Sequence, residues 1–444
     1  MARIAFFGAG YAGLVSGAGL AALGHEVVIR DVVPERIALL DSGKVPFHEP
    51  GLEELIAENR QRLRYTLSME DAVAGSGFLF VCVGTPPTPS GDANLSAVWS
   101  VIEDLPADIG SPVLVMKSTV PVGTGDKVRA ALDARGLERI GYVSCPEFLA
   151  EGTAVRDFME ADRVVVGAID EADGDAVAAL HDGLDVEVVR TDVPSAEMVK
   201  LAANAYLATR ISFINEIANV CELVGADVED VARGMGLDRR IGTHYLRAGL
   251  GYGGSCFPKD ISFLKLLAGN SGYHFQLVTA VMGVNDLQMR RPVAKLQKHL
   301  GSLQGKRIAL LGLAFKANTD DMREAPSIVL AARLIAEGAD VVAWDPVADA
   351  AALLHGVTFV RSVKEALAGA DAAVVVTEWQ ELRELSWADL RGTMRSAVVV
   401  DGRNHLDAAA MRAAGYVYEG MGRSTSSLAA LPETPEPAPT LPRE

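Results

Sequence analysis

The residue of this 444-residue chain that points most directly to chemistry is a cysteine within a glycine-rich segment. In GYGGSCFPKD, residues 251–260, Cys256 follows three glycines and precedes Pro258. Proline favours the first turn of a helix, so we expect Cys256 beside a helix N-terminus, whose dipole stabilises a thiolate. Glycines let the backbone approach a ligand, and Asp260 is close enough to act as a base or to orient water. The alternative is a structural turn with a buried cysteine.

A lysine and an asparagine form the second candidate group. Lys200 and Asn204 are four residues apart in PSAEMVKLAANAYLATRISFINEIANVCELVG, which starts at Pro194 and ends at Gly225 without an internal glycine or proline. The stretch predicts a helix of about 30 residues, on which these two side chains share one face. A cation beside a neutral donor suits an oxygen atom on which negative charge develops. The alternative is a solvated helix face.

Polar side chains also follow two predicted strands. Thr119 lies in KSTVPVGT, residues 117–124, and Glu147 and Glu151 lie in CPEFLAEGTAVRD, residues 145–157. Carboxylates at the carboxyl end of a strand can act as acid–base groups or position water. Alternatively, the two glutamates are the acidic residues typical of a helix N-terminus.

The start of the chain carries a signal for a bound dinucleotide. RIAFFGAGYAGLVSGAGLAALGHEVVIRD places Gly8, Gly10 and Gly13 between a predicted strand and a helix, and Asp31 closes the next strand. Gly8 permits a tight turn, Gly10 the approach of a pyrophosphate, and Gly13 close packing of the helix on the strand. Asp31 would bind the adenine ribose and repel a 2′-phosphate, which favours NAD over NADP, although the nearby Arg36 weakens that argument. A tight turn with nothing bound is the alternative.

Apolar runs alternate with helical stretches in two parts of the chain. This rhythm predicts an α/β protein with two Rossmann-like, doubly wound domains, joined by the long helix and a helical middle domain. We expect buried parallel strands at 3–8, 25–31, 78–84, 112–119, 139–145 and 163–168, and further strands at 306–315, 340–346, 371–379 and 396–404. We place the domain limits at 1–193, 194–300 and 301–423, and we expect a disordered, proline-rich tail at 424–444.

Composition and charge exclude several classes of partner. The formal net charge of −17 argues against nucleic acid, because an acidic chain repels phosphate backbones. No apolar run reaches the roughly 20 residues of a membrane span, so we expect no membrane partner and a cytoplasmic protein. The cysteines form no C-x-x-C pair, so we expect neither a disulfide framework nor a metal site. Cys82, Cys145 and Cys221 are predicted to be structural.

From residue 1 to about 423, the chain resembles the nucleotide-sugar 6-dehydrogenase family. The resemblance rests on GAGYAGLVSG, VGTP, KSTVPVGT, CPEFLAEGTAVRDF, EMVKLAANAYLATRISFINEIAN, GYGGSCFPKD and LGLAFKANTDDMREAP, in this order. In that family the cysteine of the segment matching GYGGSCFPKD is the nucleophile, which here is Cys256. One departure is Cys145, which stands where the family commonly has asparagine.

The resemblance implies a four-electron oxidation of the C6 alcohol of a nucleotide sugar, with UDP-glucose as the favoured substrate. Two NAD are reduced and one water is consumed. The cysteine would hold the intermediate aldehyde as a thiohemiacetal and then as a thioester. The Lys–Asn pair would hold the C6 oxygen and carboxyl groups would activate water, so the implied catalytic residues are Cys256, Lys200, Asn204, Asp260, Thr119 and Glu151.

Ligand contacts are expected along most of the chain. The expected cofactor contacts are Gly8, Gly10, Tyr11, Ala12, Gly13, Asp31, Arg36, Thr85, Thr119, Glu151 and Arg323. The expected substrate contacts are Glu147, Phe148, Leu149, Lys200, Asn204, Arg240, Tyr245, Gly253, Phe257, Lys316 and Arg403. The resemblance further implies that the substrate lies between the two α/β domains. It also implies that Arg240 reaches the site from the partner subunit of a homodimer or higher homo-oligomer, whose interface is the long helix.

Other substrates and activities remain open on the sequence alone. Within the family, dTDP-glucose, GDP-mannose and UDP-N-acetylhexosamines are alternatives. A two-electron 3-hydroxyacid dehydrogenase shares the fold and a Lys–Asn pair but has no use for Cys256. A non-catalytic NAD-binding protein is a third alternative, against which Cys256, Lys200, Asn204 and Asp260 argue together.

Overall fold

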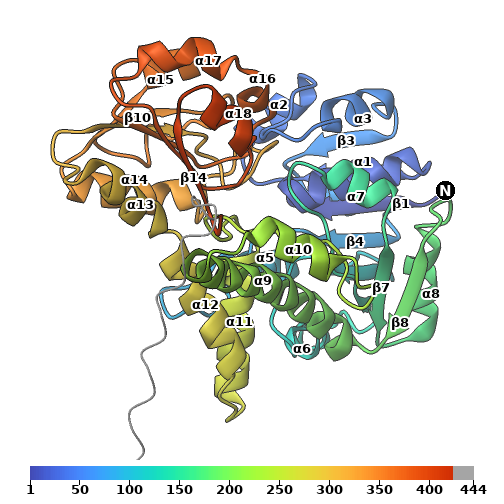
Figure 1. Cartoon of the computed structure of the whole chain (residues 1–444). Helices are drawn as coiled ribbons and strands as arrows, with labels where there is room; N and C mark the ends of the chain where they lie inside the picture. The colour runs from blue at the N-terminus through green and yellow to red at the C-terminus, as the bar shows by residue number, and fades with distance from the viewer. Residues whose placement is uncertain (424–444) are drawn as a thin grey trace, which may run out of the picture.

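Two sheets joined by a long helix make up the fold in the computed structural model, which describes residues 1–423. In Figure 1 the second sheet lies at the upper left, the first sheet at the right, and helix α9 (Val193–Val224), in green, across the middle. This arrangement confirms the expected α/β class with two Rossmann-like domains. The predicted tail at 424–444 lies outside the described residues. Across residues 1–423, no helix is long and apolar enough to cross a membrane.

The first sheet has eight strands in the order β3-β2-β1-β4-β5-β6-β7-β8. Their bounds are β1 (Arg3–Phe7), β2 (Glu26–Arg30), β3 (Leu63–Thr66), β4 (Phe78–Val81), β5 (Val113–Met116), β6 (Gly141–Ser144), β7 (Arg163–Ala168) and β8 (Glu187–Thr191). The first six are parallel, but β7 pairs antiparallel with β6, so the expectation of a parallel strand at 163–168 was wrong. The preceding helix α7 (Ala154–Met159) has six residues, too few to carry the chain back to the other end of the sheet.

Helices cover both faces of the first sheet. One face carries α1, α3, α7 and α8 over a core that includes Leu14 and Phe158, and the other carries α4, α5 and α6 over a core that includes Val101. Their bounds are α1 (Tyr11–Ala22), α2 (Pro34–Asp41), α3 (Leu52–Glu58), α4 (Met69–Val73), α5 (Ser96–Asp104), α6 (Thr124–Ala134) and α8 (Glu171–Ala179).

The second sheet is fully parallel, with six strands in the order β11-β10-β9-β12-β13-β14. The strands are β9 (Arg307–Leu311), β10 (Asp340–Trp344), β11 (Val357–Phe359), β12 (Ala372–Val375), β13 (Val398–Asp401) and β14 (Val417–Gly420). Helices α13 and α14 cover one face, and α15 to α18 the other. The helices are α13 (Arg291–Leu300), α14 (Pro326–Ala336), α15 (Val363–Leu367), α16 (Gln380–Glu384), α17 (Trp387–Leu390), the short 3₁₀ helix η1 (Arg391–Thr393) and α18 (Ala408–Ala413).

The sequence pattern did not predict β3, β8, β11 and β14, and these four strands are the edges of the two sheets. An edge strand faces solvent on one side, so it needs no continuous apolar run. β8 illustrates this, because its sequence is EVVRT and none of its residues is fully buried.

Helix α9, with 32 residues, confirms the predicted long helix and carries the candidate Lys–Asn pair. Asp192 caps its start by accepting a 2.7 Å hydrogen bond from the Ser195 N–H, and Gly225 ends it with a φ of 78°. The helices that pack along α9 or extend the central region are α10 (Val228–Gly236), α11 (Phe257–Asn270) and α12 (Gln276–Gln288). α9 thereby brings its polar face against the start of α11, next to Cys256.

Candidate active site

The glycine turn after β1 has the geometry of a dinucleotide site. Gly8 has a φ of 106°, and a Cβ on Gly13 would collide with the carbonyl oxygen of Gly8. The turn and the helix therefore require these two glycines for internal packing. By contrast, a Cβ on Gly10 would meet no other atom of the described chain within 4 Å. Gly10 sits at the start of α1 and faces open space, which leaves room for a diphosphate at the helix N-terminus.

Asp31 is buried and already has three partners. Its carboxylate accepts hydrogen bonds from the N–H groups of Ala9 at 2.7 Å and Val33 at 3.0 Å, and Arg36 pairs with it at 2.9 Å. Burial opposes the charge, but these donors hold the pKa of Asp31 below its usual value. Asp31 is thus an anion that fixes the glycine turn, and its contact with an adenine ribose stays a prediction.

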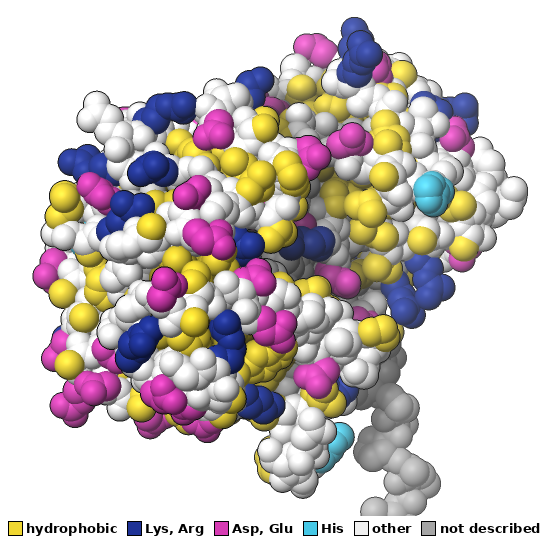
Figure 2. Space-filling model, turned by 180° about the vertical axis from the view of Figure 1, so that it is seen from behind, with side chains coloured by type: hydrophobic (Ala, Val, Ile, Leu, Met, Phe, Trp, Pro, Cys, Tyr) yellow, Lys and Arg dark blue, Asp and Glu magenta, His cyan; other side chains and the backbone are white. Residues whose placement is uncertain are grey.

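A cavity of about 1100 Å³ lies between the two α/β domains and the central helices. In Figure 2 a hollow between the two lobes is visible, with basic and acidic side chains gathered around it. The predicted site residues that line the cavity are Glu147, Phe148, Leu149, Glu151, Lys200, Asn204, Tyr245, Gly253, Cys256, Phe257, Lys316 and Arg403. Within residues 1–423, the lining does not include Thr119, Asp260, Arg240, Arg323 or the glycine turn.

Lys200 forms a buried ion pair with Glu147. The Nζ atom lies 2.9 Å from Oε1 of Glu147, and both side chains are almost fully buried. Burial opposes the charge of Lys200, but Glu147 and other negative groups raise its pKa, so it is a cation. The centre of the Phe148 ring lies 5.5 Å from Nζ, and the guanidinium of Arg163 lies 3.7 Å from the same ring centre. The cavity therefore has a fixed positive charge next to the candidate nucleophile.

Asn204 is held by Asp260 from the neighbouring helix. Its Nδ2 donates a 2.6 Å hydrogen bond to Oδ2 of Asp260, while Lys259 pairs with the other carboxylate oxygen. Asp260 is fully buried. This arrangement fixes the orientation of the Asn204 amide, because an ionised carboxylate only accepts hydrogen bonds.

Cys256 occupies the cap position of α11, where it was predicted. Whether the sulfur is a thiolate there stays a prediction, and burial opposes it. Burial raises the pKa of the thiol, and the nearby Lys200 offsets this only in part. The sequence shows that a helix begins at this point but not how deeply the sulfur is buried. Cys82, Cys145 and Cys221 are free and buried, as predicted.

The glycines before Cys256 make room for protein atoms. A Cβ on Gly251 would collide with the side chain of Asn285, and one on Gly253 with the backbone oxygen of Glu324. Gly254 packs against the ring of Phe315, which would lie 2.8 Å from an added Cβ. All three glycines also line the cavity, so they serve internal packing here, and their role in ligand approach stays a prediction.

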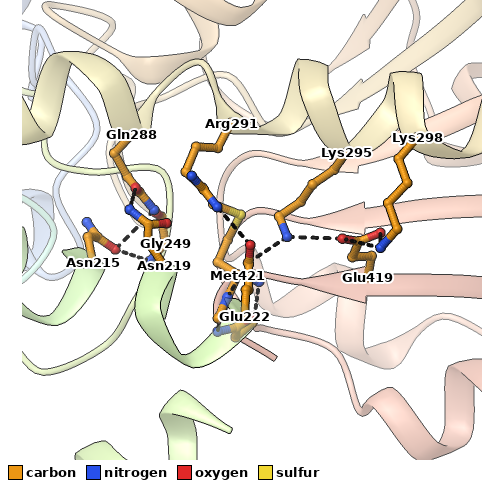
Figure 3. A network of polar contacts seen from close by, with 12 residues as sticks. Asn215, Asn219, Glu222, Gly249, Gln288, Arg291, Lys295, Lys298, Glu419 and Met421 are labelled. Carbon is orange, nitrogen blue, oxygen red and sulfur yellow. Dashed lines mark hydrogen bonds and ion pairs between the residues drawn. The ribbon is translucent and has the colours of Figure 1, made fainter. Parts of the chain in front are cut away.

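Side-chain amides form hydrogen bonds with the backbone N–H and C=O groups of this glycine loop. Asn285 accepts from the N–H of Tyr252 at 2.8 Å and donates to its carbonyl at 3.0 Å. Asn215 accepts from the N–H of Gly249, and Gln288 donates to the Gly249 carbonyl, both at 2.8 Å. Figure 3 shows Asn215 and Gln288 converging on Gly249 from α9 and α12. The loop is thus fixed by buried polar contacts from two helices.

The same close-up contains the ion pairs that join the second domain to the central helix (Figure 3). Glu222 near the end of α9 pairs with Arg291 at 2.8 Å and Lys295 at 2.6 Å. Lys295 also lies 3.1 Å from Glu419 on β14, and Lys298 lies 3.3 Å from the same carboxylate. Because Lys295 is buried between two glutamates, this network fixes α13 and β14 relative to α9.

Two predicted substrate residues lie in the second domain. Burial lowers the pKa of Lys316 from its ordinary value, although Glu151 and Glu378 oppose this effect. Arg403 donates to the carbonyls of Val376 at 2.8 Å, Phe315 at 2.7 Å and Gly251 at 3.2 Å. Arg403 therefore ties the glycine loop to the second domain in addition to lining the cavity.

Other predicted residues lie outside the cavity. Arg240 is exposed and pairs with Asp238 at 2.6 Å, and Thr119 accepts through its carbonyl from Thr85 at 2.8 Å. Arg323 pairs with Asp321 at 2.8 Å and reaches Glu151 at 3.4 Å. A contact of Arg240 with a partner subunit stays a prediction.

Sequence reasoning missed several residues of the site. Arg163 and Arg247 line the cavity, and Arg247 also lines a smaller adjoining cavity of about 340 Å³. Ser255 donates a hydrogen bond to the predicted Glu151, and Asp321 raises the pKa of that glutamate. Ser255 lies within the glycine segment and Arg247 lies just before it, so the segment itself could have indicated both residues. Arg163 gives no such signal, because its place depends on the antiparallel course of β7.

Comparison with known proteins places all three parts of the chain in one family. Residues 2–185, 194–287 and 309–408 match the NAD binding, central and UDP binding domains of the UDP-glucose/GDP-mannose dehydrogenase family. The chain is 42% identical to UDP-glucose 6-dehydrogenase TuaD of Bacillus subtilis over 95% of this chain and 94% of that protein. It is 43% identical to UDP-glucose 6-dehydrogenase of Pseudomonas aeruginosa over 95% and 97% of the two chains.

Solved structures agree with this. A UDP-glucose dehydrogenase from Pyrobaculum islandicum superposes with a TM-score of 0.86 at 36% identity, covering 95% of this chain and 98% of that one. A UDP-D-ManNAc dehydrogenase from Pyrococcus horikoshii gives a TM-score of 0.85 at 27% identity, with coverages of 96% and 100%.

Proposed function

This chain belongs to the UDP-glucose/GDP-mannose dehydrogenase family, and on that premise we propose that it oxidises UDP-glucose to UDP-glucuronate with NAD. The observation that carries the proposal is the interdomain cavity, which brings Cys256, Lys200 and Asn204 together. A two-electron alcohol oxidation needs no cysteine. A thiol beside a cation and an amide donor fits the further oxidation of an aldehyde to a carboxylate.

The glycine turn fits the cofactor that the family requires. Gly10 leaves open space at the start of α1, and the anionic Asp31 stands at the end of β2. Gly8, Gly10, Tyr11, Ala12 and Gly13 would hold the diphosphate, and Asp31 and Arg36 the adenine ribose. NAD, when bound, accepts a hydride in each of the two oxidations.

Different residues of the cavity carry out different steps of the reaction. Lys200 and Asn204 bind the C6 oxygen and stabilise the charge that develops on it. Cys256 adds to the C6 aldehyde to form a thiohemiacetal, whose oxidation gives a thioester. Water then attacks the thioester, which releases the carboxylate and the thiol. Asp260 keeps the Asn204 amide in position during these steps, and Thr119 and Glu151 complete the predicted catalytic set.

Substrate binding draws on all three parts of the chain. The segment 301–423 binds the nucleotide. Lys316 and Arg247, which line the cavity, contact the diphosphate, and Tyr245 lies near the diphosphate or the base. Glu147, Phe148, Leu149, Gly253 and Phe257 surround the sugar. Matching of residues 309–408 to a UDP binding domain supports uridine as the base.

A homodimer built on α9 belongs to the same proposal. Exposed apolar side chains recur every seven residues along this helix at Val199, Tyr206, Phe213 and Val220. Such a stripe suits a helix-to-helix contact between two copies. The exposed Arg240 then reaches the partner's cavity.

Counting the NADH formed per sugar tests the activity. Purified protein is incubated with limiting UDP-glucose, dTDP-glucose, GDP-mannose or UDP-N-acetylglucosamine and excess NAD. We expect two NADH per UDP-glucose and little turnover of the others. One NADH per sugar would refute the four-electron reaction, and a preference for another nucleotide sugar would correct the substrate.

A further inference from the structure

The resting thiol of Cys256 needs a base before it can attack. Burial raises the pKa of this thiol, which favours the protonated sulfur in the free protein. Lys200 interacts with this sulfur but is itself protonated, and an ammonium group accepts no proton. The base must therefore be another group in contact with the sulfur.

Ser255 connects the sulfur to a carboxyl group. Its hydroxyl oxygen lies 3.5 Å from Sγ of Cys256 and 3.0 Å from Oε1 of Glu151. A serine hydroxyl has one proton, and the shorter contact places it on the Glu151 side. The S–H group of Cys256 is then the donor to Ser255. The three residues form a continuous path from the sulfur to Glu151.

Glu151 lies where segments of both α/β domains and the cysteine loop meet. Besides Ser255, it accepts from Thr319 at 3.4 Å and Arg323 at 3.4 Å. The carboxyl group of Asp321 also acts on it electrostatically. Burial and the negative charge of Asp321 raise the pKa of Glu151 to about 7. A carboxyl group with this pKa exchanges a proton readily at neutral pH, as a general base must.

We propose that Ser255 passes the thiol proton of Cys256 to Glu151, and that Asp321 tunes Glu151 for this task. As the S–H bond breaks, the sulfur forms its bond to the aldehyde carbon, and the aldehyde oxygen becomes an alkoxide held by Lys200 and Asn204. The serine takes the thiol proton while its own proton moves to Glu151. No electrons leave or enter in this step, and Glu151 later returns the proton to solvent. Ser255 is thereby a catalytic residue, and Asp321 a positioning residue.

This inference rests on the proposed function, because the relay serves only the second oxidation. The test supplies the 6-aldehyde of UDP-glucose directly. Aldehyde with NAD measures the oxidation that needs the thiolate. Aldehyde with NADH measures reduction to the alcohol, which uses the same cavity without the thiolate and so reports any structural damage.

Ser255→Ala is expected to slow the oxidation at pH 7 by about 100-fold, the usual contribution of a general base. The rate of aldehyde reduction should stay within about threefold of wild type. The oxidation rate of this variant should recover as the pH rises, because the thiol then ionises without a base. Ser255→Thr keeps the hydroxyl and should restore the rate. Asp321→Asn removes a negative charge from Glu151, so the rise of the oxidation rate with pH should move to lower pH.

The rate at which iodoacetamide alkylates Cys256 tests the relay without substrate, and the rate measured with Cys256→Ser is subtracted to remove the reaction of other cysteines. In Ser255→Ala, the rise of this rate with pH should move to higher pH. An unchanged pH profile of both oxidation and alkylation in Ser255→Ala would overturn the relay, as would failure of Ser255→Thr to restore the rate. If wild-type protein reduces only one NAD per UDP-glucose, the proposed function itself fails and the relay with it.

Discussion

Asn204 on α9 donates a 2.6 Å hydrogen bond to the buried carboxylate of Asp260 on α11. This contact joins the helix that carries the oxygen-binding pair to the helix that begins at the nucleophile. Asp260 has no place in the cavity lining among the described residues, so its influence on the reaction passes through the groups it holds.

Asp260→Asn should separate the two roles of this carboxylate. Its negative charge adds to burial in raising the pKa of Cys256, so its removal should lower that pKa and speed alkylation by iodoacetamide at a given pH. Turnover should nevertheless fall by about tenfold or more, because an amide at this position both donates and accepts and no longer fixes the orientation of the Asn204 amide. Slower alkylation, or unchanged turnover, would contradict this assignment. Asp175→Asn, which breaks an exposed ion pair with Arg190, is the control and should change neither quantity.

Removing Lys200 should destabilise the fold as well as abolish activity. Lys200→Met leaves Glu147 buried without its ion-pair partner, which costs about 3–5 kcal/mol of unfolding free energy. Adding Glu147→Gln should recover most of that loss, because no uncompensated charge is then buried. Urea denaturation of both variants measures this. If the two substitutions lower the free energy of unfolding additively, the pair is not coupled. As a control, Arg190→Met, at an exposed ion pair, should lower the free energy of unfolding by less than about 1 kcal/mol.

Glu197 should make stability depend on pH near neutrality. Burial raises its pKa to about 7, although the N–H groups of Gly123 and Gly125 donate to it at 2.7 and 2.8 Å. The neutral form is favoured in the folded state, so its contribution is complete below the unfolded pKa of about 4.5 and declines as the pH rises to 7. The stability of wild type relative to Glu197→Gln should therefore fall by about 3 kcal/mol over this range and stay constant above it. A difference that rises with pH would mean that the N–H donors outweigh burial.

Two glycine substitutions should act in opposite directions. Gly251→Ala places a Cβ against the Asn285 side chain at a φ of 91°, so it should destabilise the protein and lower kcat by displacing the cysteine loop. Gly283→Ala on α12 meets nothing within 4 Å in the described chain and should stabilise the helix by up to about 1 kcal/mol. Thermal unfolding and steady-state kinetics compare the two. A tolerated Gly251→Ala would show that the Asn285 contact does not fix the loop.

Much of the site could be located from the sequence. The glycine turn, the helix start at Cys256 and the spacing of Lys200 and Asn204 are short-range features, because turn chemistry and helix period act within a few residues. The same holds for the central strands of both sheets, whose apolar runs are continuous. Edge strands lack such runs, and the direction of β7 depended on a connection too short to cross the sheet.

Only the tertiary structure decided the state of the reactive groups. The sequence by itself determined that Cys256 caps a helix, but burial by distant segments raises the pKa of its thiol. Likewise, Ser255, Glu151 and Asp321 lie in three separate segments, and nothing local indicates that they meet. The physical reason is that desolvation and hydrogen bonding depend on all the segments that pack around a group, whereas propensity and spacing depend on its neighbours in the chain.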